Sequence, residues 1–251
     1  MRDVLILCYH AVSERWPAPL SVTPEQLSTH VQILVRRKYR GVTFSEAAAS
    51  PSVPKAVAIT FDDGYRSVYE LARPILDEAG LIATVFAPTK FVGHAEPMSW
   101  PGIEDWLDTE HRNELIPMSW SELEQLREAG WEVGSHTHSH PSLPSLDQAT
   151  LESELTGSRE EIERRLGRCR SLAYPYGRRD PRVVEAAQRA GYTAAGTLAP
   201  WPTASAAPLE ASRIGVYHVD DERRFRIKVW RLMRRARATR GVALLEAAWR
   251  L

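Results

Sequence analysis

Short apolar runs rich in β-branched residues alternate along this chain with segments that carry helix signals. This alternation constrains the fold more than any other feature, because strands joined by crossover helices lie parallel in one sheet. Seven runs have strand character: 4–9, 55–61, 83–87, 131–135, 171–174, 193–196 and 213–217. The pattern predicts one α/β domain, a distorted (β/α) barrel of about seven parallel strands.

The helix signals and two irregular segments complete this outline. Thr23 and Gln26 form a capping box around Pro24, and Ser119 with Glu122 forms another; such boxes mark the first turn of a helix. Two stretches break the alternation: 93–117, rich in Trp and acids, and the Pro/Ala segment 199–208. Long loops in compact domains are frequently functional, so both are candidates to border a site.

Charge and cysteine content narrow the class of protein. The 32 Lys+Arg residues balance 32 Asp+Glu residues, so the chain lacks the basic excess of a nucleic-acid-binding protein. Cys8 and Cys169 are the two cysteines, which favours a reducing compartment. The first apolar run, 4–8, is far shorter than the roughly 20 residues of a membrane span. We therefore expect a cytoplasmic protein with no nucleic-acid partner.

Polar residues that can perform chemistry follow several of the predicted strands. In parallel α/β folds the carboxyl ends of the strands meet at one end, where active sites gather. The residues placed there are His10 after the first run, Asp62 and Asp63 after the second, His136 and His140 after the fourth, and Tyr176 after the fifth. The sequence therefore predicts a functional site at this end of the barrel.

His136 and His140 have the spacing of paired metal ligands. If the segment turns helically, residues four apart share one face, and a carboxylate from another strand end would complete a two-His, one-Asp site with open positions. Adjacent Asp62 and Asp63 could then divide their roles, one binding the metal and the other accepting a proton. The alternatives are solvent-exposed histidines and an ordinary turn or helix cap at the aspartates.

Two of these segments carry a family resemblance. TFDDG at 60–64 and SHTHSHP at 135–141 resemble the first two motifs of the polysaccharide deacetylase family, also called NodB-homology domains or carbohydrate esterase family 4. The resemblance extends from about residue 6 to 216. It implies a distorted barrel and a hydrolase of carbohydrate metabolism that removes N-acetyl groups from amino sugars with a divalent metal.

The resemblance also implies roles for individual residues. It makes Asp62 the catalytic base and Asp63, His136 and His140 the metal ligands, whereas His138 occupies a variable position of the motif. Two imidazoles and one carboxylate suit zinc, which we expect, and also cobalt or nickel.

In the third motif, YPYG at 174–177, the family places the backbone N–H of the Tyr176 position in the oxyanion hole. Ala173 stands where an arginine of the family often orients the base. Either Arg213 takes that role or Asp62 is tuned differently.

The general acid has two candidates. LILCYH, ending at His10, resembles the last motif of the family as it occurs in circularly permuted relatives, where this strand has moved to the N-terminus. His218 lies in a weaker copy of the same motif near the other end. We favour His10, since the order of strands around a barrel survives permutation.

Substrate contacts are expected from Trp100, Trp120, Trp201 and Arg213. Trp100 and Trp201 are the better candidates for stacking on a sugar because they lie in the two irregular segments. Packing in the core is the alternative for each tryptophan, since large aromatic side chains mostly lie inside.

We divide the chain into a catalytic barrel, 1–222, and a basic helical tail, 223–251. Residues 223–240 carry nine Lys/Arg and no acid, so this segment either packs on the barrel through an apolar stripe or contacts anionic lipid.

The expected activity is N-deacetylation of an amino sugar in a glycan, or in a lipid-linked or nucleotide-linked glycoconjugate. The alternatives are hydrolysis of another small amide and a non-catalytic metal- or glycan-binding module.

Overall fold

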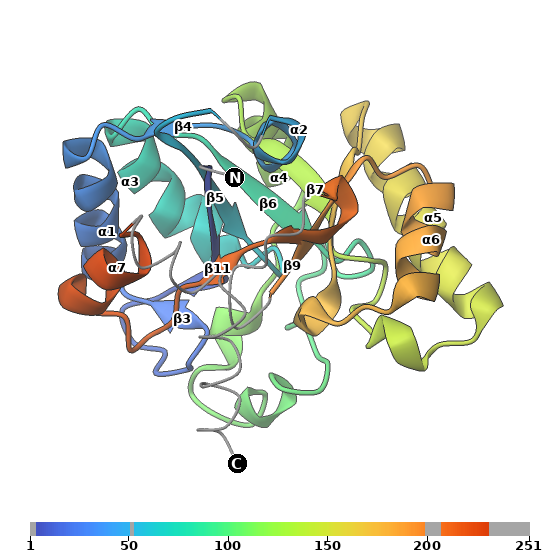
Figure 1. Ribbon diagram of the computed structural model, residues 1–251. Helices are drawn as coiled ribbons and strands as arrows, with labels where there is room; N and C mark the ends of the chain where they lie inside the picture. The colour runs from blue at the N-terminus through green and yellow to red at the C-terminus, as the bar shows by residue number, and fades with distance from the viewer. Residues whose placement is uncertain (1–3, 51–52, 199–206, 231–251) are drawn as a thin grey trace, which may run out of the picture.

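The computed structural model describes residues 4–50, 53–198 and 207–230 (Figure 1). All seven predicted strand regions form strands, and every pairing in the main sheet is parallel. The strands are β1 (Leu5–Tyr9), β5 (Ala56–Phe61), β6 (Ala83–Ala87), β7 (Glu132–Ser135), β8 (Ser171–Ala173), β9 (Ala194–Thr197), and the short pair β10 (Ala211–Ser212) and β11 (Ile214–Gly215). Their order is β10-β9-β8-β7-β6-β5-β1-β11.

The last predicted strand closes the sheet on itself. β10 pairs with β9, through Ala211 opposite Gly196, and β11 pairs with β1, through Ile214 opposite Leu7. Because β10 and β11 are separated by Arg213 alone, one extended stretch joins both edges of the sheet and makes a distorted barrel. Of the strand predicted over 213–217, residues 214–215 form β11, whereas β10 precedes the predicted range.

Besides β10, three other very short strands were not predicted. β2 (Ala11–Val12) pairs with β3 (Ser21–Val22), and β4 (Arg40–Gly41) pairs with the outer part of β5. Two residues are too few to show the alternation by which a strand is recognised in sequence.

The helices flank the barrel, and both predicted capping boxes are present. The α-helices are α1 (Pro24–Arg36), α2 (Phe44–Ala49), α3 (Arg73–Glu78), α4 (Trp120–Glu128), α5 (Gln148–Leu166), α6 (Pro181–Arg189) and α7 (Glu222–Lys228). A π-helical turn, η1 (Val68–Ala72), precedes α3. The 3-10 turns are η2 (Glu104–Trp106), η3 (Arg112–Leu115), η4 (Leu143–Ser145), η5 (Pro175–Gly177) and η6 (Pro208–Glu210). None of the helices within the described ranges is long and apolar enough to cross a bilayer.

Alternate residues of the strands face two separate cores. Those that face the helices, such as Leu7 and Ile59, belong to the large hydrophobic cluster, whereas Ile6, Ala58 and Phe86 belong to a smaller cluster inside the barrel. This alternation follows from the period of two in a β-strand. Most members of the inner cluster are alanines, so Phe86 is the one large aromatic side chain that the strands contribute to it.

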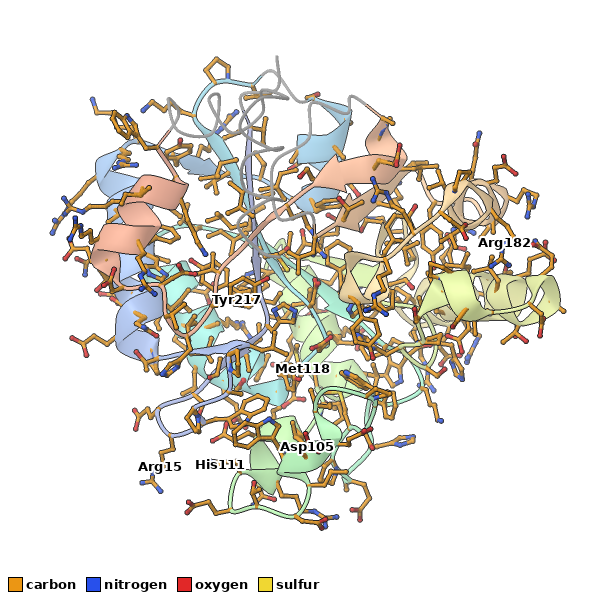
Figure 2. All side chains as sticks on the ribbon, turned by 60° about the horizontal axis from the view of Figure 1, so that its bottom comes forward. Arg15, Asp105, His111, Met118, Arg182 and Tyr217 are labelled. Carbon is orange, nitrogen blue, oxygen red and sulfur yellow. The ribbon has the colours of Figure 1, made fainter. Side chains whose placement is uncertain are left out.

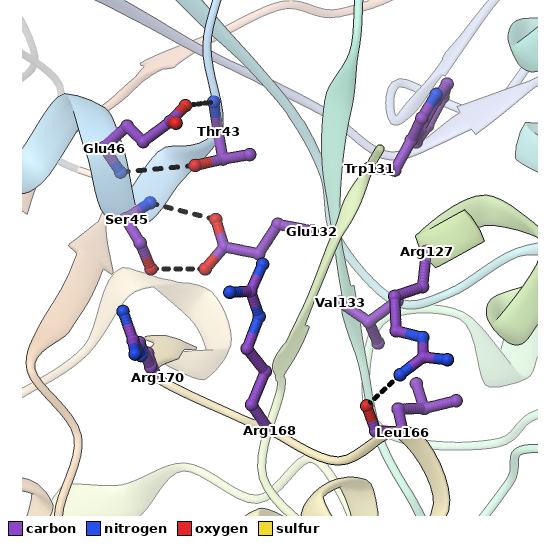
Figure 3. Close-up of a pocket in the computed structure, with 10 residues that line it drawn as sticks. All are labelled: Thr43, Ser45, Glu46, Arg127, Trp131, Glu132, Val133, Leu166, Arg168 and Arg170. Atoms are coloured by element: carbon purple, nitrogen blue, oxygen red, sulfur yellow. Dashed lines mark hydrogen bonds between the residues drawn. The ribbon is translucent and has the colours of Figure 1, made fainter. Parts of the chain in front are cut away.

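Helix α2 covers the amino-terminal end of the barrel and is anchored by a buried carboxylate. Glu132, at the start of β7, accepts hydrogen bonds from the Ser45 backbone N–H and hydroxyl (Figure 3). It also accepts hydrogen bonds from the hydroxyls of Thr84 and Ser171. A cavity of about 180 Å³ beside it is also lined by Arg168 and Arg170. The Glu132 carboxylate thus links α2, through Ser45, to strands β6 and β8, through Thr84 and Ser171.

The irregular segment 93–117 lies at the opposite end, between β6 and α4, and contains two 3-10 turns. Its Trp106 packs edge to face against Trp16, with ring centroids 5.8 Å apart. Figure 2 turns this end toward the viewer and labels Arg15, Asp105 and His111 on the loops that border it.

Helix α7 packs against α1 through a buried aromatic contact. Phe225 stacks on the His30 ring at 3.9 Å, and the His30 nitrogens contact the Tyr9 hydroxyl and the Asp220 carbonyl. Lys228 forms an ion pair with Asp220. Residues 231–251, which include most of the basic segment, lie outside the described part of the chain.

His30 makes stability sensitive to acid. Burial lowers the pKa of His30 to about 4, against the opposing effect of the Asp220 carbonyl. The unfolded chain therefore binds the proton more readily than the folded one, and stability present above pH 6.5 is lost as the pH falls toward 4. Between pH 7.5 and 5.0 we expect the parent to lose about 2 kcal/mol more unfolding free energy than His30→Gln, measured by urea denaturation. Equal losses in the two proteins would contradict this account.

Candidate metal centre

Three predicted metal ligands meet at the carboxyl ends of β5 and β7. The Oδ1 atom of Asp63 lies 3.3 Å from Nε2 of His136 and 3.3 Å from Nε2 of His140. One ligand atom from each residue lies within 4.8 Å of the other two, and all three residues are buried. The structure thus brings together a carboxylate and two imidazoles from chain segments more than 70 positions apart.

The imidazoles converge without a helix. The helical turn considered for this segment is wrong, because residues 136–140 form a loop in which Thr137 and His140 have φ angles of 66° and 63°. The Thr137 hydroxyl accepts the His140 backbone N–H, which tightens the loop. Left-handed conformations cost about 1–2 kcal/mol for residues other than glycine. Such residues gather where surrounding contacts hold a functional geometry.

The donor set fits a divalent cation. Nδ1 of His136 lies 2.8 Å from the Ala173 carbonyl, so this nitrogen carries the proton and Nε2 presents its lone pair to the centre. Burial raises the pKa of Asp63, but the neighbouring imidazoles of His136 and His140 hold that pKa well below its usual value. Three protein ligands with open positions are typical of catalytic zinc sites, whereas structural sites are closed by four.

Asp62 has different partners from its neighbour. Its carboxylate forms a bidentate ion pair with Arg213, with distances of 2.6 Å to Nη1 and 2.8 Å to Nη2. Burial raises the pKa of Asp62, but the charge of Arg213 outweighs this and, with smaller contributions including that of His136, lowers it to about 2. The Oδ2 atom lies 4.0 Å from Nε2 of His136. Asp62 is therefore an ionised, oriented carboxylate beside the ligand group.

Arg213 lies inside the barrel because the surrounding residues leave room for it. A Cβ atom on Gly196 would lie 2.7 Å from Nε of Arg213, and the guanidinium carbon lies 5.3 Å from the Phe86 ring centroid. Its side chain is 0% exposed. The expectation that Arg213 contacts substrate is therefore wrong, because its guanidinium is buried and bound to Asp62; the geometry matches its other predicted role, orientation of that carboxylate.

The two candidate acids lie in different places. One ligand atom from each of Cys8, His10 and Asp62 lies within 4.8 Å of the other two, and His10 is 7% exposed. His218 instead lies beside Pro19 and Gln26, which hydrogen-bond its backbone.

Cys8, whose Sγ lies 3.4 Å from Oδ2 of Asp62, was not identified from the sequence as a site residue. Cys8 lies two residues before His10, and residues two apart in a strand share one face, so this spacing is the signal that could have revealed it.

Aromatic rings cover the ligand group. Trp100 stacks on His140 at 4.3 Å and is 6% exposed. The Tyr176 ring meets His140 at 4.8 Å, and its hydroxyl donates to the Pro101 carbonyl. The backbone of Tyr176 has the left-handed conformation, with a φ angle of 58°, and the residue is 40% exposed. Trp100 therefore packs against a ligand instead of offering an open face to a sugar, which corrects that expectation, whereas Tyr176 presents an exposed ring beside the centre.

The other predicted aromatic contacts are not at this centre. Trp120 is half-buried under the Arg165 guanidinium and lines a groove outside the histidine loop together with Lys90 and His138. Trp201 lies outside the described residues.

Comparison with known proteins identifies the family and agrees with the fold. A family model described as "Polysaccharide deacetylase" matches residues 49–195. The chain is 28% identical over 202 residues to a putative polysaccharide deacetylase, YxkH, of Bacillus subtilis, covering 78% of this chain and 64% of that protein. It is 26% identical over 185 residues to a poly-β-1,6-N-acetyl-D-glucosamine N-deacetylase of Staphylococcus aureus, covering 68% of this chain and 59% of that one. The chain thus spans about three fifths of the length of these relatives.

Solved structures show the same architecture. A Streptococcus pyogenes deacetylase in complex with acetate has a TM-score of 0.76 at 22% identity, covering 90% of this chain and 98% of that one. IcaB from Ammonifex degensii has a TM-score of 0.70 at 23% identity, covering 91% and 97%.

Replacement of Arg213 should show how much the buried ion pair with Asp62 contributes to the unfolding free energy. Arg213→Met leaves the Asp62 carboxylate buried without its cation, and we expect the unfolding free energy at pH 7 to fall by about 3–5 kcal/mol. The deficit should shrink toward acid pH, because Asp62 without Arg213 takes up a proton more readily. Arg179→Met, which breaks a half-buried pair with Glu210, is the control and should cost no more than about 1 kcal/mol. Equal losses in urea denaturation would contradict the assignment.

Proposed function

The chain belongs to the polysaccharide deacetylase family, and on this basis we propose that it is a metal-dependent hydrolase that removes an N-acetyl group from an amino sugar. The observation that carries the proposal is the pair of adjacent carboxylates with different partners. Asp63 faces His136 and His140, whereas Asp62 faces Arg213. A binding site needs the first arrangement alone, and the second supplies an oriented proton acceptor beside it.

Each group in the site has a task in amide hydrolysis. Asp63, His136 and His140 would hold a divalent cation, most simply zinc, with cobalt or nickel as alternatives. When bound, the cation supplies Lewis acidity toward the acetamide carbonyl and the attacking water. Asp62 is ionised at neutral pH, because Arg213 holds its pKa at about 2, and accepts the proton of the attacking water.

Two further groups would act on the oxyanion and on the leaving amine. The Tyr176 backbone N–H, placed by the left-handed turn after β8, would stabilise the oxyanion, a contribution typically worth about 3–4 kcal/mol. His10 would protonate the departing amine. His10 lies beside Cys8 and Asp62.

The relatives suggest the substrate class. The Staphylococcus aureus protein is named for deacetylation of poly-β-1,6-N-acetyl-D-glucosamine. We propose an N-acetylated hexosamine in a glycan, or in a lipid-linked or nucleotide-linked glycoconjugate, as the substrate here. A cytoplasmic location with peripheral membrane contact through residues 223–240 would suit the linked substrates.

Acetate release with metal analysis tests this function. The metal-loaded protein should release acetate from one or more of polymeric, lipid-linked, nucleotide-linked and monomeric N-acetylated sugars. Chelation should abolish the release, and zinc, cobalt or nickel should restore it. Asp62→Asn should bind metal as the parent does but lower kcat by about 10²–10⁴-fold. Full activity in this variant would remove Asp62 as the base, and glycan binding without acetate release would indicate a non-catalytic module.

The leaving group distinguishes the role of His10. An amine must be protonated to depart, whereas 4-nitrophenolate leaves without a proton. His10→Asn should therefore lower kcat on the acetamide substrate by about 10²–10⁴-fold and act much less on 4-nitrophenyl acetate. His218→Asn is the matched control and should leave both rates near those of the parent. The reverse pattern would assign the acid to His218.

A further inference from the structure

A buried carboxylate on the outer helix layer binds the middle of the loop that presents His136 and His140. Glu154, in the first half of α5, accepts the backbone N–H groups of His138 and Ser139 on Oε2, at 2.9 Å and 2.8 Å. Its Oε1 atom accepts the Ser139 hydroxyl. All three donors lie between the two imidazoles that face Asp63.

A carboxylate is a costly choice at this position of the helix. Glu154 is 8% exposed and has buried Leu151, Leu155 and Ser158 as helical neighbours. Within the described chain no Lys, Arg or His side chain lies within ion-pair distance of it. A buried charge without a counter-ion is unfavourable unless hydrogen bonds satisfy it. The donors that satisfy Glu154 all come from the loop.

The loop needs such a partner because of its backbone. Thr137 and His140 are both left-handed, and the amides bound by Glu154 belong to the two residues between them. The Thr89 and Lys90 backbone N–H groups also donate to carbonyls of the loop, and the Thr89 hydroxyl contacts the His138 ring. At the start of the loop, the His136 and Thr137 N–H groups donate to the Ala87 carbonyl and the Ser135 hydroxyl. Glu154 is the acceptor for the two amides between the left-handed residues, those of His138 and Ser139.

The two imidazoles depend on this backbone to different degrees. His136 is also fixed by the contact of its Nδ1 with the Ala173 carbonyl. Nδ1 of His140 has no hydrogen-bond partner among the described atoms, and its ring is positioned by packing against Trp100 and Tyr176. The place of His140 therefore follows from the place of its backbone.

We infer that Glu154 is a positioning residue, which sets Nε2 of His140 relative to Asp63 and His136 by binding the amides of His138 and Ser139. The inference rests on the proposed function in one respect, that these three residues hold a metal ion. It adds a residue on the outer helix layer to the determinants of that site.

Zinc affinity measured without substrate tests the inference. Glu154→Ala should weaken Zn²⁺ binding about 10–100-fold, the usual effect of losing a group that orients a ligand, in competition with a fluorescent chelator. Glu154→Gln should recover most of the loss, because its amide oxygen can accept the same two N–H groups. The visible spectrum of bound Co²⁺ should change in Glu154→Ala and stay close to that of the parent in Glu154→Gln. Glu160→Ala, an exposed position on the same helix, should change neither.

A second variant covers the case in which Glu154→Ala does not fold. Ser139→Ala removes one donor to Glu154 and leaves the helix intact, and it should weaken Zn²⁺ binding about two- to tenfold. Parent-like Zn²⁺ affinity in the folded variants, or an equal loss in Glu160→Ala, would overturn the inference. A parent that binds Zn²⁺ but releases no acetate would remove the proposed function and leave the role of Glu154 standing.

Discussion

The bidentate ion pair between Asp62 and Arg213 couples closure of the barrel to the chemistry at its mouth. Arg213 lies between β10, which pairs with β9, and β11, which pairs with β1, so the stretch that closes the sheet also carries a guanidinium into the interior. A buried cation requires a paired anion, which Asp62 provides at the end of β5. The space comes from Gly196, where any side chain would meet the guanidinium.

The division of labour between the two aspartates follows from these partners. Successive residues at a strand end point in different directions, and the left-handed φ angle of Asp63 increases the divergence. Asp62 turns toward the interior and its arginine, and Asp63 turns toward the two imidazoles. Sequence adjacency thus yields two carboxylates with separate environments, which is the condition for one to bind and the other to move a proton.

Sequence reasoning reached the strands and most residues of the site, because period-two patterns and strand ends are local signals. Arg213 was a candidate because Ala173 stands where the family often has an arginine, so another cation had to be sought for Asp62. The conformation of the histidine loop was missed, since left-handed Thr137 and His140 follow from tertiary hydrogen bonds and have no glycine to mark them. Gly196 and Glu154 were missed for the same reason: their importance lies in what they touch. The expectation that Trp100 is open to a sugar rested on its place in an irregular segment, but a residue of such a segment can still be buried, as Trp100 is against His140.

The buried thiol of Cys8 can serve as a probe of local opening of the barrel. The thiol is fully buried, and burial raises its pKa well above the usual value. Reaction with an alkylating reagent requires both access and a thiolate, and the closed barrel provides neither. Cys169 is buried as well, with its pKa raised to about 12. The rate of labelling at Cys8 under native conditions therefore measures how often the strands beside Arg213 separate, a local breathing motion that a global melting curve does not register.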